Sequence, residues 1–242
     1  MKRTVFAVAL LLAGSAYAQQ FISTGMIEYE MRVNNHRMFG DGIFAEMFKD
    51  KLPNFSTYYY HLTFNDSKAL YKFDRLNEKD KIPWNNNSLE ENIWYSDYSS
   101  QTFTNQKFIF DNTYLLTDSL IKINWKLIPN ETREIAGFNC RKAQGIIFDS
   151  VYVFAFYTDE IIVSGGPMGI HGLPGMILGV TIPRMFSSWI ATKLEINGVN
   201  TGIISMPTKG KKKVASELIS TVEKATKDWG QYGQQVIWQL FL

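Results

Sequence analysis

Residues 143–157 read AQGIIFDSVYVFAFY, and this stretch decides the fold class. Two runs rich in β-branched and aromatic residues, 143–148 and 151–157, flank the polar pair Asp149-Ser150. Such residues favour extended strands, and a short polar pair between two apolar runs is typical of a hairpin turn. The stretch therefore predicts two antiparallel neighbours in a β-sheet.

The same pattern recurs toward the N-terminus, where apolar residues occupy alternate positions. One face of two predicted strands, 25–33 and 58–64, carries Ile27, Tyr29, Met31, Val33, Tyr58, Tyr60, Leu62 and Phe64. Further short strands are predicted at 67–73, 93–95, 102–103, 107–110, 114–117 and 120–127. A spacing of about ten residues with turn signals between strands favours an antiparallel meander. We predict a mainly β protein with a curved antiparallel sheet, analogous to the half-barrel of periplasmic lipoprotein carriers.

Helical periodicity is confined to a few segments, so we expect one or two helices packed on the sheet. A short helix after Asp41, which would cap it, is predicted by Phe39, Ile43, Met47 and Phe48. Residues 214–229 carry apolar side chains at helical spacing with charged residues between them, which predicts an amphipathic helix. Packing against the sheet is the ordinary role of such a stripe, and a lid or a membrane-surface contact is the alternative. Residues 236–242 predict a last edge strand.

The N-terminal residues have the features of a secretory signal peptide. Lys2 and Arg3 precede the apolar run 5–12, and Ala16-Tyr17-Ala18 fits the small-x-small cleavage pattern. The run is far shorter than the roughly 20 residues of a membrane span. Cleavage after Ala18 would leave a single β domain, 19–242, in the periplasm or outside the cell. Gln19 stands where a lipoprotein would have cysteine, so a lipid anchor is not expected.

Composition excludes several classes of protein. Hydrophobic residues make up 45% of the chain and aromatic residues 14%, enough for a sizeable core. The formal charge of +2 is too balanced for a nucleic-acid binder that relies on a basic field. Cys140 is the single cysteine, so no internal disulfide can form and a buried apolar role is expected.

Residues 165–180, GGPMGIHGLPGMILGV, contain the candidate binding residues. Pro174 and Gly175 occupy the central positions expected for a type II turn, and the apolar run 176–180 predicts a strand buried on both faces. The ordinary interpretation is a tight loop that leads into a buried strand. The functional interpretation is a loop presenting backbone amides to an anion or carboxylate. The candidate residues are Gly166, Pro167, His171, Gly172, Leu173, Pro174 and Gly175, with His171 expected in a solvent-exposed turn unless it is a ligand.

The stretch 125–179 resembles the GLPGLI family, exported proteins found mainly in Bacteroidota. The resemblance rests on Trp125, Glu131-Thr132, Ile135-Ala136-Gly137-Phe138, Cys140-Arg141-Lys142-Ala143, Tyr157-Thr158, Glu160-Ile161, Gly166-Pro167 and Gly172-Leu173-Pro174-Gly175-Met176-Ile177-Leu178. Met176 replaces the Leu of the family motif, and Phe156 and Met168 replace frequent family residues. The family has no established enzyme activity, so the resemblance implies location and fold more than function. Ser119 and Ser150 stand in Asp-Ser-apolar triplets that resemble acceptors of Bacteroidota O-glycosylation.

Catalytic chemistry has little support in the sequence. His36, His61 and His171 show no metal-ligand spacing, and no nucleophile motif is present, so no catalytic residue, metal or cofactor is predicted. We predict a non-enzymatic binding or accessory factor of the cell envelope, serving outer-membrane transport or assembly. Its partners would be the proteins of those systems or an apolar ligand held under the C-terminal helix. The alternatives are a hydrolase or metal-dependent enzyme with a scattered site, and a purely structural interaction partner.

Overall fold

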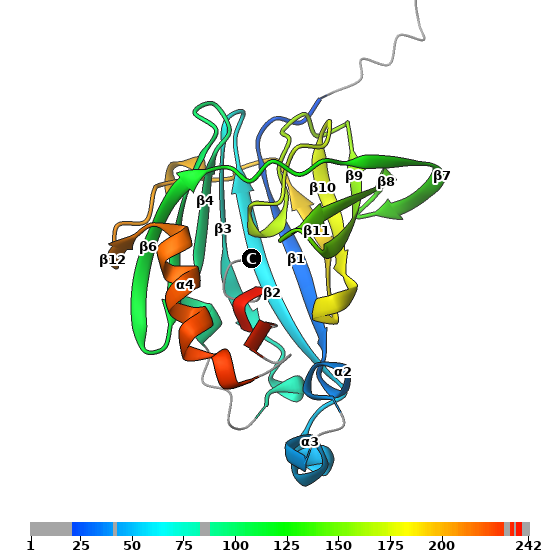
Figure 1. The fold of residues 1–242 in the computed structure, drawn as a ribbon. Coiled ribbons are helices and arrows are strands. Elements are labelled where there is room, and N and C mark those ends of the chain that lie inside the picture. The colour runs from blue at the N-terminus through cyan, green and yellow to red at the C-terminus, as the bar shows by residue number, and fades with distance from the viewer. Residues whose placement is uncertain (1–20, 41–42, 83–87, 230–232, 235, 239–242) are drawn as a thin grey trace, which may run out of the picture.

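The computed structural model describes residues 21–40, 43–82, 88–229, 233–234 and 236–238. Its strands form one open, strongly curved sheet (Figure 1) in the order β12-β6-β5-β4-β3-β2-β1-β11-β10-β9-β8-β7. β1 is a central strand because it pairs with both β2 and β11, and it thereby joins the two halves of the chain. The predicted curved, mainly antiparallel sheet is confirmed. The short β12 adds one parallel pairing, with β6.

Many strand bounds lie within a few residues of those predicted, but the strands predicted at 102–103 and 107–110 form one strand, and the strand at 187–195 was not predicted. The first half comprises β1 (Gly25–Asn34), β2 (Phe55–Phe64), β3 (Lys68–Leu76), β4 (Ile93–Asp97), β5 (Thr102–Ile109) and β6 (Asn112–Ser119). The second half comprises β7 (Lys126–Ile135), β8 (Phe138–Ile147), β9 (Val151–Thr158), β10 (Met176–Ile182), β11 (Ser187–Glu195) and β12 (Lys211–Lys213). The strand predicted through 120–127 begins only at Lys126.

One face of the sheet is covered, and the other carries exposed and half-buried side chains except where strands such as β10 are buried on both faces. Tyr29 and Leu62 are buried on the covered face, while Glu28 and His61, their neighbours in sequence, lie opposite each other on the outer face. This alternation is the period of 2 expected of half-buried strands. The covered face carries a contiguous aromatic row, in which Tyr60 stacks on Tyr71 and Tyr71 meets Trp94 edge-on.

Tight turns connect the hairpins. The β8–β9 turn is confirmed, but Phe148 and Asp149 occupy its left-handed positions, with φ of 48° and 60°, one residue earlier than expected. Phe110 and Asp111 repeat this arrangement between β5 and β6. Two consecutive positive φ values match the right-handed twist of the flanking strands, which explains the conformation despite the bulk of Phe.

The helices are short. They are α2 (Asn35–Phe39), α3 (Ile43–Phe48) and α4 (Ala215–Ala225), with 3-10 turns η2 (Lys49–Lys51), η3 (Glu78–Asp80), η4 (Ser88–Glu91), η5 (Pro167–Gly169), η6 (Pro183–Met185), η7 (Thr201–Ile203) and η8 (Lys227–Trp229). The helix predicted after Asp41 is α3, although Asp41 itself lies outside the described residues. Among those residues, no helix has the length and apolar character needed to cross a membrane.

α4 packs on the covered face, as its apolar stripe predicts. Leu218 and Val222 form a second core cluster with Ile109, Leu116 and Ile237. The predicted helix 214–229 is too long, since Val214 and Trp229 are about half exposed and the α-helix ends at Ala225. The predicted last strand is also wrong: residues 236–238 are helical, and residues 239–242 lie outside the described part.

The segment 120–125 connects β6 to β7 by crossing the covered face (Figure 1). Ile123 and Trp125 of this segment press against β8 at Gly145. A Cβ atom built on Gly145 would lie 2.6 Å from Cγ2 of Ile123, so glycine is required for the close approach. The crossing segment therefore covers part of the sheet that α4 does not reach.

The loop 165–175 leads into β10, whose residues 176–180 are buried on both faces as predicted. The type II turn is not closed as expected. The N–H of Gly175 donates to Leu173 O at 2.8 Å, making a three-residue turn at Pro174, and the N–H of Met176 donates to Ile161 O at 3.0 Å. The positive φ expected at Gly175 is confirmed, at 134°.

Substitution of Gly175 by alanine should destabilise the fold strongly. A Cβ atom there would lie 2.0 Å from Thr158 O, a backbone atom that cannot move away alone. We expect a loss of about 3 kcal/mol or more, from strain and overpacking together. Gly137→Ala is the matched control, because Gly137 also has positive φ but no atom within 4 Å of a built Cβ. Urea unfolding of both variants checks this, and equal losses would contradict the close contact.

Candidate functional site

A pocket of about 80 Å³ lies on the covered face, where the two halves of the sheet are bridged. β4 and β5 supply one wall, the crossing segment a second, and the end of β8 with the η5 loop a third. Its lining residues are Ser96, Phe103, Asn105, Leu120, Ile121, Ile123, Ile147, Phe148, Met168, Gly169 and Ile170. The walls are mainly apolar with few polar groups, which is the usual composition of small-molecule sites.

Asn105 is the polar feature of this pocket. Among the described residues, no donor reaches its buried Oδ1 atom. Ser96 is the other polar side chain in the lining, and none of the lining residues is titratable. The arrangement can hold an apolar group and accept one hydrogen bond, and it offers no acid, base or activated nucleophile.

The η5 loop reaches the pocket through a kinked backbone. Met168 has φ of 57° and Gly169 has φ of 76°, and the N–H of Ile170 donates to Pro167 O at 3.1 Å. At Gly166, a built Cβ would lie 2.8 Å from Ile170 O, so this glycine allows the loop to fold back on itself. The kink directs residues 168–170 toward β4 and β5.

None of the seven residues predicted from the sequence lines this pocket, although Pro167 and His171 directly flank its lining residues 168–170 in sequence. Pro167 and Leu173 are buried in the core, Gly172 and Pro174 are exposed, and Gly166 and Gly175 make close backbone contacts. Many amides of this loop and of the start of β10 are already engaged: N–H groups that donate within the protein are those of Gly165, Ile170, Gly172, Gly175, Met176 and Ile177. The loop therefore acts mainly as a support for β10 and η5, and the anion-binding interpretation gains no geometric support.

His171 is buried rather than exposed as expected, with 9% of its surface accessible. Its Nδ1 atom lies 3.1 Å from Gly169 O, and its carbonyl oxygen accepts a hydrogen bond from Trp125 Nε1 at 2.9 Å. The ring of Tyr98 lies beside it, at 6.1 Å between centroids. Burial lowers the pKa of His171, so the neutral ring is favoured. His171 thus joins the motif loop to the crossing segment.

Lys107 is a buried ionisable residue that no sequence pattern predicted. It is 1% exposed on the covered face of β5, with Nζ 3.8 Å from the centroid of the Trp94 ring. Burial lowers the pKa of Lys107 well below its ordinary value. Lys107 follows Asn105 by two residues, which places both side chains on the same face of the strand.

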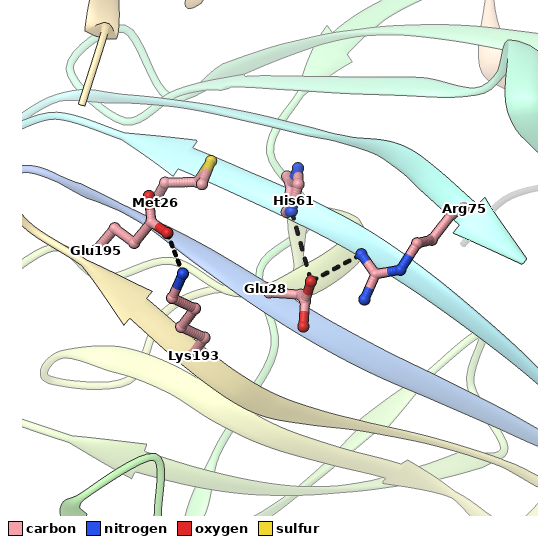
Figure 2. Close-up of a pocket in the computed structure, with 6 residues that line it drawn as sticks. All are labelled: Met26, Glu28, His61, Arg75, Lys193 and Glu195. Carbon is pink, nitrogen blue, oxygen red and sulfur yellow. Dashed lines mark hydrogen bonds and ion pairs between the residues drawn. The ribbon is translucent and has the colours of Figure 1, made fainter. Parts of the chain in front are cut away.

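A second cluster lies on the outer face, over β1, β2, β3 and β11 (Figure 2). Figure 2 shows Glu28 between His61 and Arg75, beside the Lys193–Glu195 pair. Glu28 Oε2 lies 2.8 Å from Arg75 Nη1 and 3.8 Å from His61 Nε2. The ion pair with Arg75 lowers the pKa of Glu28, since the guanidinium stabilises the carboxylate. The cluster borders a pocket of about 170 Å³.

Glu28, His61 and Asp74 have the ligand types of a metal centre. One ligand atom from each lies within 4.8 Å of the others. Arg75 already binds both carboxylates, at 2.8 Å from Glu28 and 2.5 Å from Asp74, and Thr192 donates to the second oxygen of Glu28. A divalent cation would have to displace Arg75, so the geometry is that of an ion-pair network. Sequence spacing could not reveal it, because its members come from adjacent strands.

Cys140 has no catalytic setting. Its side chain is fully buried, as predicted, and burial raises the pKa of the thiol to about 12. The thiolate is therefore disfavoured at neutral pH, and the residue packs as a small apolar side chain.

Comparison with known proteins shows the fold alone. No family model and no curated protein matches the sequence. The structure of PNGF-II in space group P21 is similar, with a TM-score of 0.50 and 17% identity over 84% of this chain. PNGF-II in space group C2 aligns with a TM-score of 0.48, 17% identity and 86% coverage of this chain. The chain spans about a third of the length of PNGF-II, 34% and 33% in the two forms.

An uncharacterized conserved protein from Thermus thermophilus aligns over 86% of this chain and 99% of its own. The TM-score is 0.42 and the identity 6%. Together the fold and the pocket define a class: an open curved β-sheet whose covered face holds a small apolar pocket.

The stability of the protein should fall as the pH drops below about 6.5, and His171 should contribute to that loss. Its folded pKa is lowered, so the unfolded state, titrating near 6.5, takes up a proton first. The contribution of the neutral His171 ring to the free energy of unfolding is fully present above about pH 6.5. It is lost as the pH falls toward the folded pKa. The free energy of unfolding should fall less between pH 7 and pH 5.5 in the His171→Gln variant than in the parent protein, as measured by urea titration at each pH. An NMR titration placing His171 at or above 6.5 would contradict its buried position.

Proposed function

We propose that this protein is an exported, GLPGLI-like factor of the cell envelope that binds an apolar ligand without catalysing a reaction. The observation that carries the proposal is the pocket on the covered face, whose lining is apolar apart from Ser96 and Asn105. A binding role fits this lining, since burying apolar surface supplies affinity and one polar group orients the ligand. Service to outer-membrane transport or assembly is the role that the signal-like N-terminus and the family resemblance favour.

The lining also argues for binding rather than catalysis. Ser96 is its one hydroxyl, and no lining residue could act as the base that activates a serine nucleophile. The nearest histidine of the motif loop, His171, has its Nδ1 atom engaged with the backbone of Gly169.

The pocket should hold one end of a neutral apolar dye such as Nile red, with the rest of the dye lying over the rim at Ile121, so binding should be saturable and Ile121→Asp should weaken it at least fivefold. Ile121 is 55% exposed at the edge of the pocket, so the variant should fold while placing a carboxylate beside the apolar walls. Ile162→Asp is the matched control, since Ile162 is 54% exposed and outside the lining. Fluorescence titration measures both. Absence of saturable binding, or equal weakening in both variants, would refute the proposed pocket function.

A second candidate, a metal-dependent hydrolase, is favoured by the Glu28–His61–Asp74 cluster. Because Arg75 occupies both carboxylates, we expect the parent to bind Zn²⁺ no more tightly than about 100 μM. Arg75→Ala frees the carboxylates and should tighten binding about tenfold, and adding His61→Ala should abolish that gain. Isothermal titration calorimetry measures all three. Submicromolar Zn²⁺ binding by the parent would instead support the metal-dependent enzyme.

A further inference from the structure

We infer that the ligand of the covered-face pocket is an uncharged amphiphile whose hydroxyl or amide N–H donates to Asn105 Oδ1. This inference rests on the proposed function, because it names the chemistry of the molecule held at that site. It is carried by three properties of the pocket: an acceptor without a donor, the absence of charge in the walls, and the small enclosed volume.

The acceptor sets the polar end of the ligand. Asn105 Oδ1 is buried, and no described residue donates to it. A carbonyl oxygen can only accept, so the complementary group must carry an O–H or N–H. A buried acceptor without a partner is unfavourable. Because Asn105 lines the pocket and its amide torsion is soft, the amide can turn Oδ1 toward a ligand, and a group that donates to it removes that cost.

The walls exclude a charged head group. None of the lining residues carries a charge. The Ser96 hydroxyl and the Asn105 amide N–H groups are the side-chain donors of the lining, and they are neutral, so a buried carboxylate would lack a cation to balance its charge. Lys107 lies on the same face of β5, but its Nζ atom lies over the Trp94 ring, and the residue is not part of the lining.

The volume sets the size of the enclosed part. About 80 Å³ is roughly half the ~150 Å³ of engineered apolar cavities that hold benzene. A short alkyl segment or the edge of a ring fits the closed region. Ile121 is half exposed at the rim of the pocket. The part of an alkyl chain that does not fit inside can therefore lie against this apolar side chain.

Two isomers and one acid test the head group. 1-Octanol and 1-methoxyheptane have the same atoms, but the ether lacks a donor, and octanoate replaces the donor with a charge. Each competes with Nile red for the parent protein. We expect 1-octanol to displace the dye at about tenfold lower concentration than the ether, the value of one hydrogen bond of about 1.4 kcal/mol. Octanoate should be no better than the ether.

Variants at Asn105 assign the preference to this atom. Asn105→Leu keeps the branching at Cγ but removes both polar atoms, so it should bind the alcohol and the ether equally. Asn105→Ala is a second variant that also lacks the acceptor and adds no volume. Asn139→Ala is the control, because Asn139 is exposed at the other end of β8 and should leave the tenfold preference intact. Circular dichroism establishes that each variant is folded.

The outcomes separate this inference from the proposed function. Dye binding that is retained by the parent but shows no alcohol preference, or a preference for octanoate, would overturn the inference alone. A preference that persists in both Asn105 variants would also overturn it, because another group would then be the acceptor. Loss of specific dye binding altogether would overturn the proposed function.

Discussion

The burial of one face of a wide, curved sheet is the constraint on which the rest of this structure depends. The aromatic row of Tyr60, Tyr71 and Trp94 runs across neighbouring strands and is buried throughout. Removing that apolar surface from water is the main source of stability for such a sheet. Because α4 is only 11 residues long, it covers the β5–β6 side, and other elements must complete the cover.

The pocket is a consequence of this divided cover. The segment 120–125 crosses from one half of the sheet to the other, and the η5 loop folds in from the second half (Figure 1). Trp125 donates to His171 O and thereby ties these two covering segments together. The pocket over Ser96 and Asn105 lies where these two segments meet β4 and β5. The pocket thus lies at the junction between two of the segments that cover the sheet.

The outer face is stabilised by different means. It presents Glu28, His61 and Arg75 from three neighbouring strands, linked by ion pairs and further shielded by the stacking of Arg75 over Tyr59, 4.0 Å from its ring centroid. Partly exposed pairs of this kind contribute little individually, so their role is mainly to keep opposite charges in register across the strands. The two faces therefore differ in chemistry: one excludes water and offers a pocket, and the other balances charge in solvent.

The sequence by itself determined the local structure. Alternation in 25–33 and 58–64 predicted β1 and β2, and the continuous apolar run 176–180 predicted a strand buried on both faces, because side-chain direction in a strand has a period of 2. Only the tertiary structure decided where these strands meet. The pairing of β1 with β11, the crossing of 120–125 over the sheet and the convergence of Asn105 with Met168 depend on contacts between residues far apart in the chain. His171 shows the limit most directly: its turn-like sequence predicted exposure, but the packing of the crossing segment and Tyr98 around it buries the ring, which no local pattern records.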